Sequence, residues 1–218
     1  MYNLPQSTIV NKVIPKKTLV SQLGANTRMK DHLTNDVVRV EWLAKLAPST
    51  INVADGKEGH EITVFLVPVK DKNCSDDFFS FVDSLMPRHT LFILRWGEMS
   101  CLHLNYKEWM GNNTKADKAF RIVQTYRSQW VKDTEISLSI EGLNMDAIYG
   151  TLVRQVAGKR IILQSENLHE DVEKSSQYEA LLKEIEILKR KENKEKQPQK
   201  KFVLHQQRIA LELKISKK

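Results

Sequence analysis

Residues 61–67 have the sequence EITVFLV, with apolar side chains at successive positions from Val64 to Val67. A strand with one solvated face would alternate apolar and polar residues, so this continuous pattern predicts a central strand covered on both faces. Pro68 cannot donate a hydrogen bond to a strand ladder, and it therefore predicts the end of the strand. A strand of this kind requires a sheet with helices packed on it.

Alternating patterns on both sides of this segment predict further strands. Residues 37–46 alternate apolar side chains with arginine, glutamate and lysine, which indicates a strand with one buried face. A Gly-Glu pair joins residues 91–96 to residues 99–106, and a two-residue connection with glycine first is typical of a type II′ hairpin. Residues 135–140 alternate again and predict one more strand.

Helix signals lie between the predicted strands. Ser75 precedes two aspartates, which favours a helix start, and Pro87 would end that helix. Thr114 and Asp117 have the spacing of a capping box, which predicts a loop and then a helix in residues 112–129. Two further helices are predicted, one capped by Thr18 with Leu19, Leu23, Met29 and Leu33 on its apolar face, and one from Asn144 to Gly158.

This order of elements predicts an α/β (α+β) fold, in which a mixed β-sheet is flanked by helices. We assign residues 1–160 to this globular body. Residues 161–218 differ in composition, with no glycine from residue 170 onward, and are predicted to form a basic helical tail.

Pro198 divides the tail into two predicted helices. The first carries an apolar stripe of about one and a half heptads, which is short for a sustained coiled coil. A hairpin of the two helices and pairing with another chain both stay open. The predicted partner-helix face consists of Tyr178, Leu181, Leu182, Ile185 and Leu188.

The net charge of +7 is concentrated in the tail. Residues 1–150 hold 18 basic and 17 acidic side chains, whereas residues 151–218 hold 16 and 10. An electrostatic partner, DNA or protein, is therefore expected to meet the C-terminal part. No aromatic residues lie within the basic run to stack on bases, so a merely solvated helix end is the alternative. The predicted contact residues are Lys189, Arg190, Lys191, Lys194, Lys196, Lys200 and Lys201.

The composition, 41% hydrophobic and 28% charged, is that of a folded globular protein. The sequence shows no apolar run long enough to cross a bilayer and no secretory signal pattern, so we expect a cytoplasmic protein that does not enter a membrane. Cys74 and Cys101 are expected to be reduced thiols, since two distant cysteines form neither a disulfide framework nor a zinc knuckle.

No catalytic residue, metal ligand or cofactor is predicted. A nuclease of the restriction type would need two carboxylates and a lysine around a metal, but Asp36, Glu41 and Lys45, or Glu61 and Lys70, lack that spacing. Phosphate-binding glycine loops and nucleophile elbows are missing from the sequence. The histidines are scattered, and His103 is expected on the less buried side of its hairpin.

Several segments together carry a family pattern. They are residues 4–5 (LP), 10–17 (VNKVIPKK), 41–53 (EWLAKLAPSTINV), 61–65 (EITVF), 91–94 (LFIL), 142–146 (GLNMD) and 194–197 (KEKQ). In these segments the chain resembles a bacterial family known as domain of unknown function 4391. The family has no established activity, so no residue inherits a role from it.

The resemblance implies a genomic context, because members tend to lie beside DNA methyltransferases and helicase-type restriction subunits. By this resemblance the chain looks like an accessory component of a phage-defence or restriction-modification system. Our leading hypothesis is a non-enzymatic interaction subunit whose body docks on a helicase or methyltransferase while the basic tail contacts protein or DNA. The alternatives are a divergent metal-dependent nuclease acting on DNA and a toxin-like effector.

Overall fold

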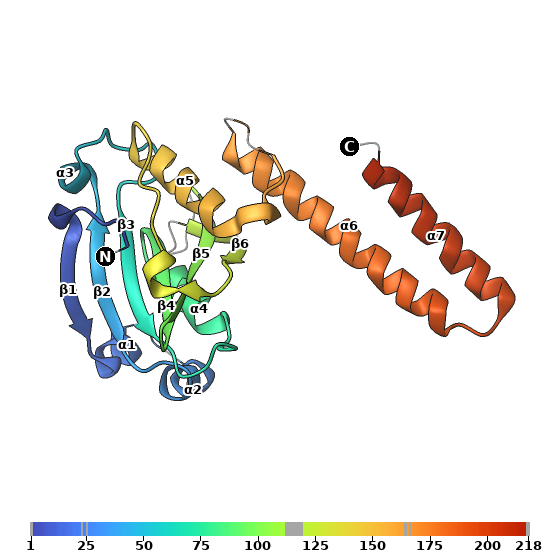
Figure 1. The fold of residues 1–218 in the computed structure, drawn as a ribbon, viewed down its shortest axis with the longest axis horizontal. Coiled ribbons are helices and arrows are strands. Elements are labelled where there is room, and N and C mark those ends of the chain that lie inside the picture. The colour runs from blue at the N-terminus through green and yellow to red at the C-terminus, as the bar shows by residue number, and fades with distance from the viewer. Residues whose placement is uncertain are drawn as a thin grey trace. The chain divides into compact units, whose positions relative to one another are not determined.

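The computed structural model describes residues 2–22, 24, 26–111, 120–163, 165 and 167–216. The chain forms two compact units, Met1–Gly158 and Lys159–Lys218. The first unit is an α/β body and the second is a helical hairpin (Figure 1).

The body is built on one mixed sheet with the strand order β1-β2-β3-β4-β5-β6, and β7 pairs with β5. β3 and β4 run parallel, in a register that places Ile62 beside His89, and the other neighbouring strands are antiparallel. The strands are β1 (Ile9–Ile14), β2 (Val40–Leu46), β3 (Ile62–Pro68), β4 (His89–Trp96), β5 (Met99–Trp109), β6 (Phe120–Arg127) and β7 (Val131–Lys132).

Helices cover both faces of the sheet (Figure 1). Leu19, Leu33 and Phe79 bring α1, α2 and α4 into one core cluster with Phe65 and Phe92 of the sheet. α5 packs on β5 and β6 from the other face. The helices of the body are α1 (Lys16–Gln22), α2 (Thr27–Asn35), α3 (Pro48–Ile51), α4 (Asp77–Leu85) and α5 (Met145–Ala157), with 3-10 turns at Gln6–Thr8, Asp133–Glu135 and Gly158–Arg160.

The predicted mixed sheet flanked by helices is confirmed. β3 lies inside the sheet and is buried along most of its length, as its continuous apolar pattern predicted. The hairpin is also confirmed, since Trp96 pairs with Met99 and Gly97 has a φ of +56°. Asn144 caps α5 by accepting a hydrogen bond of 2.9 Å from the backbone N–H of Ala147.

Several predictions for the body are wrong. The single helix predicted from Thr18 through Leu33 forms as two helices, α1 and α2, and Thr18 lies inside α1. The pattern of residues 5–17, which has no periodicity, predicts an extended lead-in, but Ile9–Ile14 form the edge strand β1, whose central positions are exposed and therefore show no apolar alternation. The helix predicted within residues 112–129 is replaced over Phe120–Arg127 by β6, which pairs with β5. The capping residues proposed for that helix, Thr114 and Asp117, lie outside the described residues.

The strand predicted at residues 135–140 is also wrong. Ile136 and Leu138 are buried, as the alternation required, but the segment does not join the sheet. Leu138 donates its backbone N–H to the carbonyl of Tyr2, and the side chain of Gln155 bonds the backbone of the two residues flanking Leu138. These contacts occupy the backbone groups that a ladder would need.

The second unit is a hairpin of α6 (Leu168–Lys194) and α7 (Pro198–Ser216), which confirms the predicted pair of helices. Proline at the start of α7 suits a first helical position, where its missing N–H is not needed. Glu192 near the end of α6 accepts a hydrogen bond of 2.9 Å from Arg208 and lies 3.0 Å from His205 of α7. Within the described ranges, the helices are all too short or too polar to cross a bilayer.

Candidate functional site

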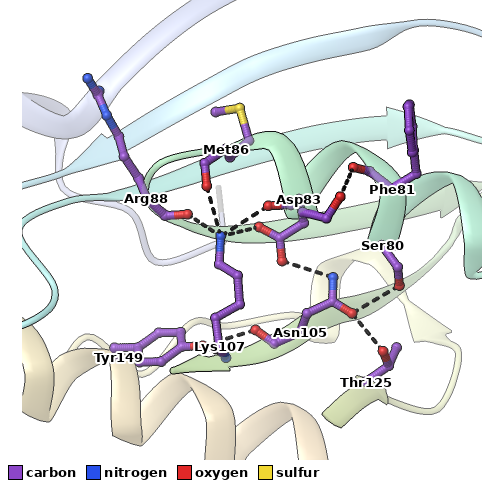
Figure 2. A network of polar contacts seen from close by, with 10 residues as sticks. Ser80, Phe81, Asp83, Met86, Arg88, Asn105, Lys107, Thr125 and Tyr149 are labelled. Carbon is purple, nitrogen blue, oxygen red and sulfur yellow. Dashed lines mark hydrogen bonds and ion pairs between the residues drawn. The ribbon is translucent and has the colours of Figure 1, made fainter. Parts of the chain in front are cut away.

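A buried ion pair joins α4 to β5 in the body. Lys107 Nζ lies 2.7 Å from Asp83 Oδ1, and both side chains are completely buried. Figure 2 shows the Lys107 ammonium group surrounded by oxygen atoms, since it also bonds the backbone carbonyls of Asp83, Met86 and Arg88. Burial lowers the pKa of Lys107, and the Asp83 carboxylate opposes that shift. The pair therefore fixes the connection from α4 to β4.

Neighbouring polar groups complete this network (Figure 2). Asn105 donates 2.9 Å to the second carboxylate oxygen of Asp83, and its own side-chain oxygen accepts from Ser80 and Thr125. The Tyr149 hydroxyl donates to the carbonyl of Asn105 and accepts from the backbone N–H of Lys107. The pairing of β5 with β6 shifts register at this point, so Tyr149 bonds backbone groups beside an irregularity of the ladder.

His89, the first residue of β4, lies directly beside this network. Its side chain is 3% exposed, and its ring stacks on Tyr149 with centroids 3.6 Å apart and also contacts Phe120. Burial, with the nearby charges of Lys107 and His60, lowers the pKa of His89 to about 3. The ring is therefore neutral at physiological pH. Its Nδ1 atom is buried and has no hydrogen-bond partner among the described residues.

A cavity of about 470 Å³ opens against His89, and we call it the His89 cavity. Its walls come from the loop before β3, the connection between α4 and β4, the end of β5 and the start of β6. The residues that line it are Lys57, Glu58, Gly59, His60, Glu61, Pro87, Arg88, His89, Trp109 and Phe120.

The loop wall of the cavity is held by α5. The Asp146 carboxylate, in the first turn of that helix, accepts hydrogen bonds of 2.6 Å from the backbone N–H of Lys57 and 2.7 Å from that of Gly59. A side chain at Gly56 would collide with this arrangement, since its Cβ would lie 2.2 Å from the carbonyl oxygen of Gly59. The loop is thus fixed by contacts between segments about 90 residues apart.

The structure does not bring together the nuclease candidates. Asp36 contacts His32 at 2.6 Å, and Lys70 donates to the carbonyl of Thr34. Lys45 instead pairs with Glu61 at 2.8 Å, and Arg88 pairs with the other oxygen of that carboxylate. Among the described residues, no three His, Cys, Asp or Glu side chains are grouped as a metal site.

His103 contradicts its prediction, because its side chain is fully buried rather than on the less buried side of the hairpin. α4 covers this face of β5, so the ring packs against Phe79 with centroids 5.3 Å apart and lies 3.0 Å from Asp76. Cys101 and Cys74 are both free and buried. Burial raises the pKa of Cys101 to about 12, which makes it a poor nucleophile.

The predicted contact residues gather at the turn of the hairpin, residues 189–201, which we call the hairpin tip. All seven basic side chains there are exposed. Arg190 pairs with Glu186, and the other six form no ion pair within the described part of the chain. The two acidic residues of the tip are engaged internally: Glu192 contacts Arg208 and His205, and Glu195 accepts from the backbone N–H of Gln197.

The predicted partner-helix face is divided by the hairpin. Leu188 is buried, and Tyr178, Leu181 and Ile185 are half-buried, as expected for a stripe of α6 that packs on α7. Leu182 is exposed.

The fold consists of an α/β body and a basic helical hairpin, and the two candidate sites are the cavity on the body and the exposed basic tip of the hairpin. The chain belongs to the family described as domain of unknown function (DUF4391), whose model matches residues 2–212. No curated protein and no solved structure matches it.

Substitution of Lys107 by Met should lower the free energy of unfolding by roughly 3–5 kcal/mol, because Asp83 is left as an unpaired buried charge. Chemical denaturation measures this loss. Adding Asp83→Asn should recover part of the stability, since the uncompensated charge disappears. Lys12→Met, at an exposed strand position, is the matched control and should stay within about 0.5 kcal/mol of the wild type. If Lys107→Met and Lys12→Met lose similar amounts of unfolding free energy, the ion pair has no special role in stability.

His89 should make the body sensitive to acid. Its folded pKa of about 3 lies below the ordinary value of 6.5, so its contribution to stability is complete above pH 6.5 and is lost as the pH falls toward 3. Between pH 7 and pH 4, the wild type should lose about 3 kcal/mol more unfolding free energy than His89→Phe. The control His169→Phe, at an exposed position of α6, should keep the wild-type pH profile. Parallel profiles for wild type and His89→Phe would contradict the assignment.

Proposed function

We propose that this protein is a non-enzymatic interaction subunit of a bacterial phage-defence or restriction-modification system in the cytoplasm. In this proposal it docks on a larger helicase or DNA methyltransferase, and the hairpin tip contacts DNA close to that partner. The genomic context comes from the family resemblance. The observation that carries the proposal is the unneutralised positive charge of the hairpin tip.

The positively charged side chains of the hairpin tip are exposed to solvent. Residues 189–201 contain seven basic and two acidic side chains, and both carboxylates are occupied by groups of the hairpin itself. Exposed lysines without ion pairs are available to phosphate groups, and each phosphate contact releases condensed counterions from DNA. A polyanion therefore fits this surface better than an acidic peptide that offers a few charges.

Apolar side chains on the hairpin support a protein partner as well. Both helices of the hairpin leave large apolar residues exposed, in addition to the stripe that packs between the helices. These exposed residues are Leu182, Ile187, Phe202, Val203, Ile209 and Leu213. Contiguous exposed apolar patches often mark protein interaction sites, and these residues lie on the same hairpin as the basic tip.

Replacing the seven basic residues of the hairpin tip by Gln should weaken DNA binding and flatten its salt dependence. Each lost phosphate contact should reduce the slope of log K against log salt concentration by roughly 0.9. Fluorescence anisotropy with a labelled duplex, measured over a range of salt concentrations, tests this. Substitution tests the charge of the tip more directly than truncation after residue 188, because truncation also removes α7 and exposes the packed face of α6.

The matched control removes positive charge elsewhere. Lys12, Lys17 and Lys30 are exposed residues of the body, and their replacement by Gln should leave the salt slope almost unchanged. If the tip variant keeps the wild-type affinity and slope, DNA contact by the hairpin tip is wrong.

The protein should co-purify with the helicase or methyltransferase subunit encoded beside it when the two are expressed together. Phe202→Ser with Val203→Ser should reduce the recovered complex, because both side chains would lose apolar contact with the partner. Val13→Ser is a matched control, since Val13 on β1 and Val203 on α7 are both 54% exposed. A complex that never forms would contradict the docking role.

A further inference from the structure

The His89 cavity has a buried polar group that the fold itself leaves without a partner. A neutral imidazole has one N–H donor and one acceptor nitrogen. Within the described residues neither ring nitrogen of His89 makes a hydrogen bond, and Nδ1 is fully enclosed. Nε2 is not among the fully enclosed unpaired atoms, so it is the nitrogen that a ligand in the cavity can bond.

The loop at Gly59 lies close to the ring edge of His89. A Cβ atom at Gly59 would lie 3.1 Å from His89 Nε2 and 3.0 Å from Cδ2, closer than ordinary contact. Gly59 and His89 both line the cavity. A side chain at residue 59 would therefore press on the Nε2 edge of the ring.

Aromatic rings form the adjacent wall. Phe120 packs edge-on against Trp109 with centroids 5.3 Å apart, and it also contacts the ring of His89 at 4.8 Å and the Lys107 ammonium group at 5.4 Å. Trp109 remains 40% exposed although it lines the cavity. An exposed indole beside a hydrogen-bonding imidazole is a surface for a planar ring that carries polar atoms on its edge.

The lining of the cavity carries no net formal charge, since Lys57 and Arg88 are matched by Glu58 and Glu61. Glu61 is shared between Arg88 and Lys45, which lies 2.8 Å from it. Arg88 uses one terminal nitrogen for Glu61, and Lys57 forms no ion pair in the described part of the chain. These two cations can meet one phosphate group, but the balanced lining does not favour a triphosphate.

We propose that the His89 cavity binds a nucleoside monophosphate unit, with the base against Trp109 and Phe120, the base edge bonded to His89, and the phosphate near Arg88 and Lys57. The volume of about 470 Å³ lies in the range of small-molecule pockets. The same unit occurs as a free mononucleotide and as the 5′-phosphorylated end of a nucleic acid strand. This site lies on the body and is independent of the proposed contact by the hairpin tip.

Isothermal titration calorimetry on the full chain tests the proposal. The probes are AMP, GMP, CMP and UMP, with adenosine, ribose 5-phosphate and inorganic phosphate as parts of the ligand. At least one mononucleotide should bind with a Kd below about 1 mM, more tightly than any of its parts. A 5′-phosphorylated oligonucleotide that binds with the same dependence on Trp109 identifies a strand end as the ligand. An oligonucleotide that fails to bind identifies the free mononucleotide.

Single substitutions in the cavity test the role of each residue in binding. Trp109→Leu should weaken mononucleotide binding about 10-fold, and Arg88→Gln should weaken it while leaving adenosine binding unchanged. His89→Phe keeps an aromatic ring stacked on Tyr149, and it should weaken the binding of both the mononucleotide and adenosine. Trp96→Leu is the matched control, because Trp96 is also 40% exposed but lies outside the cavity, and it should bind like the wild type.

Absence of saturable binding by all four mononucleotides would overturn the proposal. So would wild-type affinity in both Trp109→Leu and Arg88→Gln, or an equal loss in Trp96→Leu. Binding that survives the Gln substitutions of the hairpin tip would separate this site from the proposed DNA contact.

Discussion

The body depends on the ion pair between Lys107 and Asp83, two charges fully withdrawn from water. Transfer of each ion into the protein interior costs several kcal/mol, so such a pair persists only where hydrogen bonds complete its coordination. Here the ammonium group is shared between the carboxylate and three backbone carbonyls, and the carboxylate also accepts from Asn105. Because these partners come from α4, the connection to β4, and β5, the pair holds three segments in one geometry.

That geometry determines the neighbouring cavity. Lys107 bonds the carbonyl of Arg88, and His89 follows as the first residue of β4. The hydroxyl of Tyr149 bonds the backbone on both sides of Tyr106, while its ring supports the ring of His89. The positive charge of Lys107 is also one of the causes that lower the pKa of His89. The same buried lysine therefore helps to position the histidine and, together with burial as the larger cause, keeps its imidazole neutral.

Much of the fold could be predicted from the sequence where buried segments and helix ends have recognisable residue patterns. The continuous apolar run of β3, the Asn144 cap of α5 and the break at Pro198 each correspond to an observed feature. The errors occur where a segment has few apolar contacts or unusual partners. β1 is an exposed edge, so its side chains carry no alternation. In β6, Phe120 and Val123 have helical spacing, but Phe120 and Tyr126 are the buried residues and Val123 is exposed. Residues 135–140 have the alternation of a strand, but they bond to Tyr2 and Gln155.

The two candidate sites also differ in how far the sequence predicts them. Charged residues exposed to water can form a local excess in a sequence, whereas a buried site is assembled from distant segments. An exposed lysine costs little to leave unpaired, so the basic run of the hairpin tip has no need of partners within the fold and is visible as a local excess. The His89 cavity is assembled from the loop at residues 57–61, Arg88 and His89, and the two aromatic residues on either side of residues 112–119. No local spacing connects these residues. The cavity and the unpaired Nδ1 of the buried imidazole become visible only once the fold is known.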